Sequence, residues 1–420
     1  MGNCCNQLDQ QESSATTEYN RSEELNVIKR NYTGKIIGTS KVCFENTSPI
    51  KLQNTQGFLG KRSVKLHGCI IPGLDPRGET DKDCQDNYIY FIQDNAILCT
   101  LFDGHGKEGQ KISDFCIDFV AKFFKKNIKD FAYNAKETLT RMLHKCDEKL
   151  RRSKVPDEMA GSTAVAIYIT STNIFSASLG DSRAIIATLS DTLIPVPIPT
   201  HRFYKKILIK RNLKPVSLTT DQKPNHEEEF TRIQAAGGCV EQVTDNFGKP
   251  IGPYRVWMKN KDYPGLAMSR SIGDRIAKRL GVIATPVCHD FQLYNTDQFI
   301  VIASDGIWDV MENIEVVNFV EKFKKGCGES TDLYPAKPDN SSIARMLCEE
   351  ARFRWYGIIE AEDVMIDDIS CIIVDFEDIS GAMKTQVKER NVEAFRSMAI
   401  APQHNHANTS INEDDNETKD

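Results

Sequence analysis

Six aspartates lie at the ends of apolar segments that have the length and composition of β-strands. Asp103 follows ILCTLF and Asp305 follows FIVIAS. The others are Asp181 after NIFSASLG, Asp86 just before YIYFI, and Asp367 and Asp368 before ISCIIVDF. One such acid commonly caps a turn, but acids at the ends of five strands indicate a cluster. A buried, unpaired carboxylate is costly or shifts its pKa. Grouped carboxylate oxygens are the ligands that Mg²⁺ and Mn²⁺ prefer.

The loop that contains Asp103 also has the glycine spacing G-x-G-x-x-G, at Gly104, Gly106 and Gly109. A dinucleotide site with this spacing needs a second parallel strand that ends in an acid about 20 residues further on. Helical periodicity continues through that region, and Asp103 would repel a pyrophosphate. We therefore expect the glycines to serve another purpose, such as letting the Gly104 carbonyl approach an ion.

The pattern C-x5-R of cysteine phosphatases occurs twice, from Cys146 to Arg152 and from Cys348 to Arg354. Both copies lie in segments with helical periodicity, and both carry two acids between their ends. A phosphate-binding loop needs free backbone N–H groups and no negative charge. We therefore expect neither copy to be a catalytic loop.

The composition narrows the class of protein. The 420 residues include 59 acidic and 53 basic ones, a net charge of −6, so nothing indicates a nucleic-acid partner. No apolar run approaches the roughly 20 residues of a membrane-spanning helix. The 13 cysteines include no C-x-x-C pair and are typical of reduced thiols in a cytosolic protein.

The periodicity indicates a mixed architecture. Helices are expected near 112–124, 139–150, 227–238, 314–323 and 342–355, and strands near 88–92, 96–102, 162–170, 173–181, 182–189, 299–305 and 369–376. Short turns between the three strands from 162 to 189 predict that they pair antiparallel. Strand runs alternate with helix pairs, so we predict an α+β fold. Residues 190–215 are Pro-rich and then basic. We interpret them as an insertion that forms a solvated loop, the alternative being a docking surface for an acidic partner.

The chain begins MGNCCNQLDQ, which places Gly2 at the acceptor position for N-myristoylation. Cys4 and Cys5 could add palmitate, and two acyl chains make a membrane anchor stable. Asn6 replaces the Ser or Thr of the usual pattern. We expect residues 1–45 to form a flexible tether at the cytoplasmic face of a membrane, and residues 379–420 to form a largely polar tail.

Nine segments, in order, resemble the metal-dependent Ser/Thr protein phosphatases of type 2C (PP2C). They are CQDNYIYF (84–91), LFDGHGKEG (101–109), GSTAVAIYI (161–169), LGDSRAII (179–186), LTTDQKPN (218–225), RIQAAGG (232–238), LAMSRSIGD (266–274), IASDGIWDVM (302–311) and DDISCIIVDF (367–376). The resemblance implies that 46–378 is a phosphatase domain of two packed antiparallel β-sheets flanked by helices, an α-β-β-α sandwich. It also implies activity on phosphorylated proteins, and we expect the chain to be a monomer.

The resemblance also assigns site residues. It implies that Asp103 bridges two Mg²⁺ or Mn²⁺ ions and that the Gly104 carbonyl binds the first ion. It places Asp305 and Asp367 on the second ion, while Asp86 supports water at the first. Asp181 and Asp309 match the positions of a third, weaker metal site in some members.

Two positions depart from the family pattern. Gln85 stands where many members have Glu, and Asp81 stands where animal members have a phosphate-binding arginine. We expect Lys82, or failing that Arg77, to contact the substrate phosphate as a point charge.

The implied chemistry is hydrolysis of phosphoserine and phosphothreonine. A hydroxide that bridges the two metals would attack phosphorus in line. His105, two residues beyond Asp103, could then protonate the leaving oxygen as general acid. The main alternative is a pseudophosphatase, a binding or regulatory module that keeps the fold without turnover; Gln85 and the missing arginine favour it.

Overall fold

The protein is described by a computed structural model, which covers residues 55–73, 84–93, 95–195, 207–324, 343–358 and 366–377. Lys82, Asp81, Arg77, Gly2, Cys4 and Cys5 lie outside these residues. No helix within them is both long enough and apolar enough to cross a membrane.

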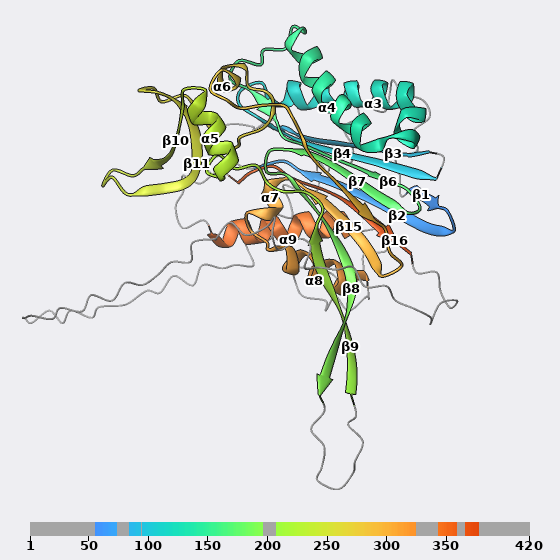
Figure 1. Cartoon of the computed structure of the whole chain (residues 1–420). Helices are drawn as coiled ribbons and strands as arrows, with labels where there is room; N and C mark the ends of the chain where they lie inside the picture. The colour runs from blue at the N-terminus through green and yellow to red at the C-terminus, as the bar shows by residue number, and fades with distance from the viewer. Residues whose placement is uncertain are drawn as a thin grey trace, which may run out of the picture.

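Two antiparallel sheets form the centre of the molecule (Figure 1). The first has the order β1 (Thr55–Leu59), β2 (Arg62–Ile71), β16 (Ile369–Phe376), β15 (Asp297–Ala303), β8 (Arg183–Pro195) and β9 (Ile207–Ser217). The second has the order β13 (Ile272–Gly273), β5 (Gly161–Ser162), β4 (Ala96–His105), β6 (Ala164–Ile169), β7 (Asn173–Leu179) and β14 (Val287–Gln292), with β3 (Asp86–Gln93) paired to β4.

Helices cover the outer face of each sheet. The second sheet is covered by α3 (Gly109–Tyr133) and α4 (Ala135–Arg151), and the first by α7 (Asp305–Trp308), α8 (Asn313–Lys324) and α9 (Ile343–Ile358) (Figure 1). A third apolar cluster fills the space between the sheets. The predicted α+β sandwich, with layers α-β-β-α, is confirmed.

Side-chain alternation along the strands explains this layering. On β4, Leu98 and Phe102 pack toward α3 and α4, while Ile97 and Leu101 pack toward the other sheet. Asp103 continues the parity of Ile97 and Leu101, so it lies on the face between the sheets. The alternation along β4 therefore also directs the Asp103 carboxylate into the space between the sheets.

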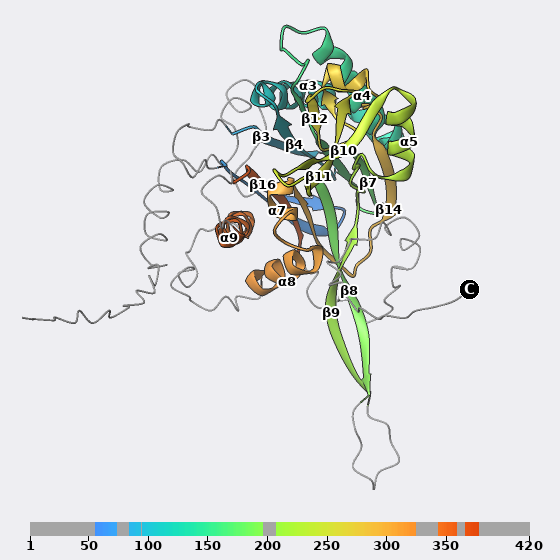
Figure 2. The ribbon, with the colours of Figure 1, turned by 90° about the vertical axis from the view of Figure 1, so that its left-hand side faces the viewer.

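A smaller unit lies at one end of the sandwich, on the left in Figure 1 and toward the viewer in Figure 2. It consists of the sheet β10 (Gly238–Thr244), β11 (Pro250–Met258) and β12 (Pro264–Leu266), together with α5 (Glu227–Ala235) and α6 (Arg275–Lys278). Its own small core includes Ile233, Val256 and Leu280. Apart from α5, the sequence analysis did not predict these elements.

The predicted pairing of all three strands between 162 and 189 is wrong in one respect. β6 and β7 pair as expected, but β7 and β8 belong to different sheets. The turn at Gly180–Ser182 carries the chain from one sheet to the other, and Gly180 adopts φ +90° there. A short turn allows either outcome, and the core between the sheets decides which forms.

The region 190–215 also differs from the predicted solvated loop. Its described parts continue β8 to Pro195 and form most of β9, and the two strands pair from Ile185↔Ser217 to Pro195↔Ile207. Figure 1 shows this ribbon leaving the body of the protein. Backbone pairing across the hairpin supplies the hydrogen bonds that a solvated loop would make with water.

Candidate metal centre

The strand registers bring the predicted acids to one end of both sheets. In the second sheet, Asp86 at the start of β3 lies directly opposite Asp103 near the end of β4. In the first sheet, Ala303 at the end of β15 lies opposite both Cys371 near the start of β16 and Arg183 at the start of β8. The acids that follow or precede these strand ends therefore face one another across the sandwich.

Asp86 and Asp103 share the face between the sheets, since directly opposed residues of antiparallel strands point to the same side. The Gly104 N–H donates to the Gln85 carbonyl at 3.1 Å, which fixes the loop after Asp103. A Cβ atom on Gly104 would collide with the backbone of Gly109 and Gln85. Only glycine allows the backbone at position 104 to pack this closely against these two segments.

Gln85 has a structural role in this loop. Its side-chain amide donates to the Gly106 carbonyl at 2.7 Å, and its backbone N–H donates to Asp368 Oδ2 at 2.8 Å. Asp368 thus joins the start of β3 to the start of β16. The sequence analysis noted Asp368 at a strand end but gave it no role.

The other acids come from the first sheet and from the turn between the sheets. Asp305 begins α7 directly after β15, and Asp367 precedes β16. Asp181 lies in the turn that connects the sheets and is buried. Asp309 follows α7 and carries a pKa raised first by burial and further by Asp181 and Asp367.

Lys223 supplies a positive charge that the sequence analysis missed. Its Nζ donates to Asp181 Oδ2 at 2.5 Å. Burial alone would lower the pKa of Lys223, but Asp181, and further away Asp221 and Asp305, raise it above its usual value. An ion held by Asp181 and Asp309 would compete with this ammonium group. The lysine is visible in the motif LTTDQKPN, but its partner lies 42 residues away.

The carboxylates fit a cation by their charge and by their unpaired atoms. Burial and the neighbouring acids raise the pKa values of Asp103 and Asp305 well above the usual range. Burial and Asp368 raise the pKa of Asp86 to about 7. The Oδ1 atoms of Asp86, Asp181 and Asp305 are buried without a hydrogen-bond partner. Within the described residues no group of three or more His, Cys, Asp or Glu side chains has an arrangement ready to hold a metal ion, so the fit rests on charge and donor type: hard oxygen donors that need a positive partner.

His105 ends β4 beside the carboxylates. Its Nε2 lies 2.7 Å from Asp274 Oδ2, and Ser271 Oγ donates to the same oxygen at 2.5 Å. Removal from water would lower the pKa of His105, but Asp274 raises it above its ordinary value. The Asp274 carboxylate thus fixes the ring and favours its protonated form. The sequence analysis quoted the motif that contains Asp274 without assigning it a role.

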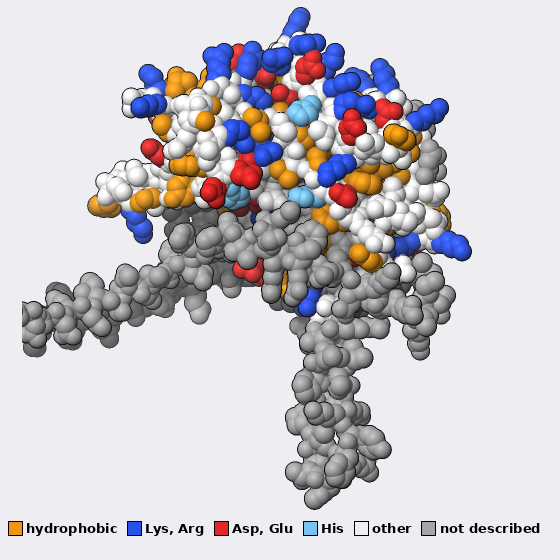
Figure 3. Space-filling view, viewed as in Figure 1, with side chains coloured by type: hydrophobic (Ala, Val, Ile, Leu, Met, Phe, Trp, Pro, Cys, Tyr) orange, Lys and Arg blue, Asp and Glu red, His pale blue; other side chains and the backbone are white. Residues whose placement is uncertain are grey.

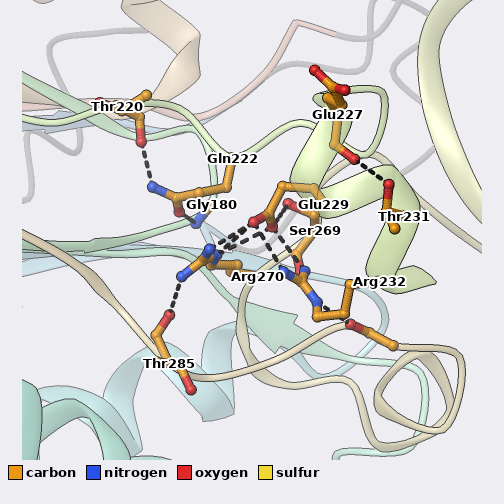
Figure 4. A network of polar contacts seen from close by, with 11 residues as sticks. Gly180, Thr220, Gln222, Glu227, Glu229, Thr231, Arg232, Ser269, Arg270 and Thr285 are labelled. Atoms are coloured by element: carbon orange, nitrogen blue, oxygen red, sulfur yellow. Dashed lines mark hydrogen bonds and ion pairs between the residues drawn. The ribbon is translucent and has the colours of Figure 1, made fainter. Parts of the chain in front are cut away.

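A polar network anchors the loop that carries Asp274 (Figure 4). Glu229 of α5 accepts from Arg232 at 2.8 and 2.9 Å and from Arg270 at 2.6 Å, and it also pairs with Ser269 Oγ. Arg232 further donates to the carbonyls of Gly281 and Ser269 at 2.8 and 2.9 Å. The network holds α5 against Ser269, Arg270 and Gly281, a few residues from Asp274.

Glu229→Gln should lower the free energy of unfolding by roughly 3–5 kcal/mol at pH 7, because it leaves two partly buried guanidinium groups without their anion. Burial would raise the pKa of Glu229, but the bonds from Arg232, Arg270 and Ser269 lower it to about 2. A lowered carboxyl pKa stabilises the fold above the unfolded value of 4.5 and loses this contribution as the pH falls toward 2. Denaturant titrations at several pH values should therefore show the difference shrinking below pH 4.5. Glu228→Gln, on the exposed side of α5, is the matched control; an equal effect there would contradict the prediction.

The two C-x5-R segments lie on α4 and α9, as the sequence predicted. Burial raises the pKa of the Cys146 and Cys348 thiols, which keeps them protonated. Neither segment is a phosphate loop.

Residues 92–354 match the family Protein phosphatase 2C, and the chain belongs to this family of serine/threonine phosphatases. A protein of Oryza sativa subsp. japonica named "Probable protein phosphatase 2C 64" is 30% identical over 289 residues, which cover 67% of this chain and 60% of the relative. "Probable protein phosphatase 2C 65" of Arabidopsis thaliana is 31% identical over 302 residues, which cover 67% of this chain and 69% of the relative. The crystal structure of a serine-threonine phosphatase 2C from Toxoplasma gondii shares the fold, with a TM-score of 0.50 at 18% identity over 75% of this chain and 95% of that one.

Proposed function

We propose that this protein hydrolyses phosphoserine and phosphothreonine in other proteins, as a monomer, with two Mg²⁺ or Mn²⁺ ions. The observation that carries the proposal is the group of buried and half-buried carboxylates from both sheets beside the His105–Asp274 pair. When bound, the two ions supply an activated water and neutralise the phosphoryl oxygens.

The residues of the chain divide the remaining work. Asp103 and the Gly104 carbonyl would hold the first ion, with Asp86 beside them, and Asp305 and Asp367 would hold the second. Protonated His105 would donate its proton to the departing serine or threonine oxygen, while Asp274 keeps the ring oriented. Asp181 and Asp309 remain the proposed ligands of a third ion, and Lys82 remains the proposed phosphate contact.

Hydrolysis of a phosphothreonine peptide with and without Mn²⁺ tests this function. We expect phosphate release that depends on the metal and that Asp305→Asn abolishes. A wild-type chain as silent as Asp305→Asn, with the fold intact by circular dichroism, would leave the pseudophosphatase as the better interpretation. Binding of NAD or ATP that raises the melting temperature where metal does not would instead favour a nucleotide-binding protein.

We further propose that Gly2 carries a myristoyl group, with palmitate on Cys4 or Cys5, and that the acyl chains hold the protein at the cytoplasmic face of a membrane. Gly2→Ala should move the protein from the membrane to the soluble fraction after cell fractionation. Asn6→Ser completes the usual acceptor pattern and should stay on the membrane. A Gly2→Ala variant that remains membrane-bound would refute the anchor.

A further inference from the structure

A hollow of about 460 Å³ lies between α4 and α6, outside the carboxylate cluster. It is lined by His144, Asp147, Glu148, Arg151, Arg275, Lys278 and Arg279. The four α4 residues are spaced three and four apart, so they form one face of the helix. The volume lies within the range of small-molecule sites, roughly 300–1,000 Å³. Figure 3 shows lysine and arginine side chains gathered over this part of the molecule.

The charges around the hollow do not balance. Its two carboxylates already have cationic partners: Asp147 accepts from Lys278 at 2.7 Å, and Glu148 pairs with Arg152 at 2.6 Å. Arg275 is bound to Asp157. Arg151 and Arg279 are exposed, and neither side chain makes a hydrogen bond or ion pair with the described residues. The hollow is therefore positively charged in a chain whose net charge is −6.

We propose that this hollow binds a phosphate group. Guanidinium groups recognise phosphate through paired hydrogen bonds, and Arg151 and Arg279 approach the hollow from two different elements. Arg151 alone would be explained by its place in the last turn of α4, where a cation offsets the helix dipole. Arg279 is the C-cap of α6, but this helix has only 4 residues and so few aligned peptide dipoles to offset. The volume has room for a phosphate and for part of the molecule that carries it.

The same residues connect the hollow to His105. Lys278 Nζ donates to the carbonyls of Gly273 and Ser271, and Asp147 accepts from the Gly273 N–H at 2.9 Å. The next residue, Asp274, contacts His105. A bound phosphate would compete with Asp147 for Lys278 and so act on the segment that orients His105. This second part of the inference, a change in turnover on binding, rests on the proposed phosphatase function.

Isothermal titration calorimetry of inorganic phosphate into the EDTA-treated full chain tests binding without any need for turnover. We expect a site whose affinity falls at least about tenfold in Arg151→Gln/Arg279→Gln, because two charge-assisted contacts are lost. Lys145→Gln/Lys149→Gln removes the same charge from exposed positions of α4 that do not line the hollow, and it should bind like the wild type. Equal affinity in wild type and the arginine variant, or equal losses in both variants, would overturn the proposal.

Kinetics then distinguish the source of the phosphate. If it is a second phosphate of the substrate, the arginine variant should raise KM for a doubly phosphorylated peptide and leave a singly phosphorylated one unchanged. If it is a separate phosphorylated ligand, added O-phosphoserine should change kcat for the singly phosphorylated peptide in the wild type but not in the arginine variant. Binding that persists with neither kinetic effect would overturn the connection to His105. A chain without any phosphatase activity would refute the proposed function and leave the binding result standing.

Discussion

Asp103→Asn should lower metal-dependent hydrolysis of a phosphothreonine peptide by about 10³-fold or more. The Asp103 carboxylate interacts electrostatically with acids of both sheets, so removing its charge would weaken both proposed ion positions. The loss follows from the several kcal/mol that metal ions contribute to stabilising charge in such transition states. Steady-state kinetics across a Mn²⁺ titration would measure it, and excess metal should not restore the rate.

The same variant should be more stable than the wild type when metal is absent. Burial and the neighbouring acids Asp86, Asp305 and Asp367 raise the pKa of Asp103, which means that its charged form is unfavourable in the fold. Neutralising it relieves this repulsion, so the melting temperature in EDTA should rise while activity disappears. Asp118→Asn, on the exposed side of α3, should change neither quantity. Normal activity in Asp103→Asn would show that Asp103 is not part of the metal centre.

His105→Gln should reduce kcat for the phosphothreonine peptide by roughly 10²–10⁴-fold, the usual contribution of a general acid. An aryl phosphate should lose much less, because a phenolate leaves without first gaining a proton. Burial would lower the pKa of His105, but Asp274 raises it. The wild-type rate should therefore persist beyond the ordinary histidine range and fall as the pH passes the raised pKa. The variant should lack that decline.

His289→Gln is the matched control: this partly buried histidine lies on β14, the edge strand of the second sheet. It should leave the peptide rate and the pH profile unchanged. Equal losses on peptide and aryl phosphate in His105→Gln would instead indicate that the residue supports the site structurally.

The sequence predicts local features of this protein well. The runs that lead to Asp103 and Asp305 are mostly apolar, and the helix that begins at Gly109 has a clear apolar face. Such signals depend on neighbouring residues alone. The α-β-β-α layering followed from the resemblance of nine motifs to the family, and the registers agree with it.

The features that sequence reasoning missed depend on residues far apart. His105 and Asp274 are separated by 169 positions, and Glu229 and Arg270 by 41. No periodicity reports such a pair. The predicted hairpin at Gly180–Ser182 was wrong for a different reason. A tight turn fits both a hairpin and a passage from one sheet to the other, and only the packing of the whole core decides which of the two forms.

Because of that crossing, the candidate centre is formed by residues from both sheets of the sandwich. Asp86 and Asp103 belong to one sheet, and Asp305 and Asp367 border the other. Asp181 lies in the turn that connects the two sheets. A cation bound by both groups would connect the two sheets. Its binding affinity and the free energy needed to separate the sheets would then be thermodynamically linked. Substitutions in the core between the sheets, remote from every carboxylate, would then lower the activity of the enzyme by lowering its affinity for the ion.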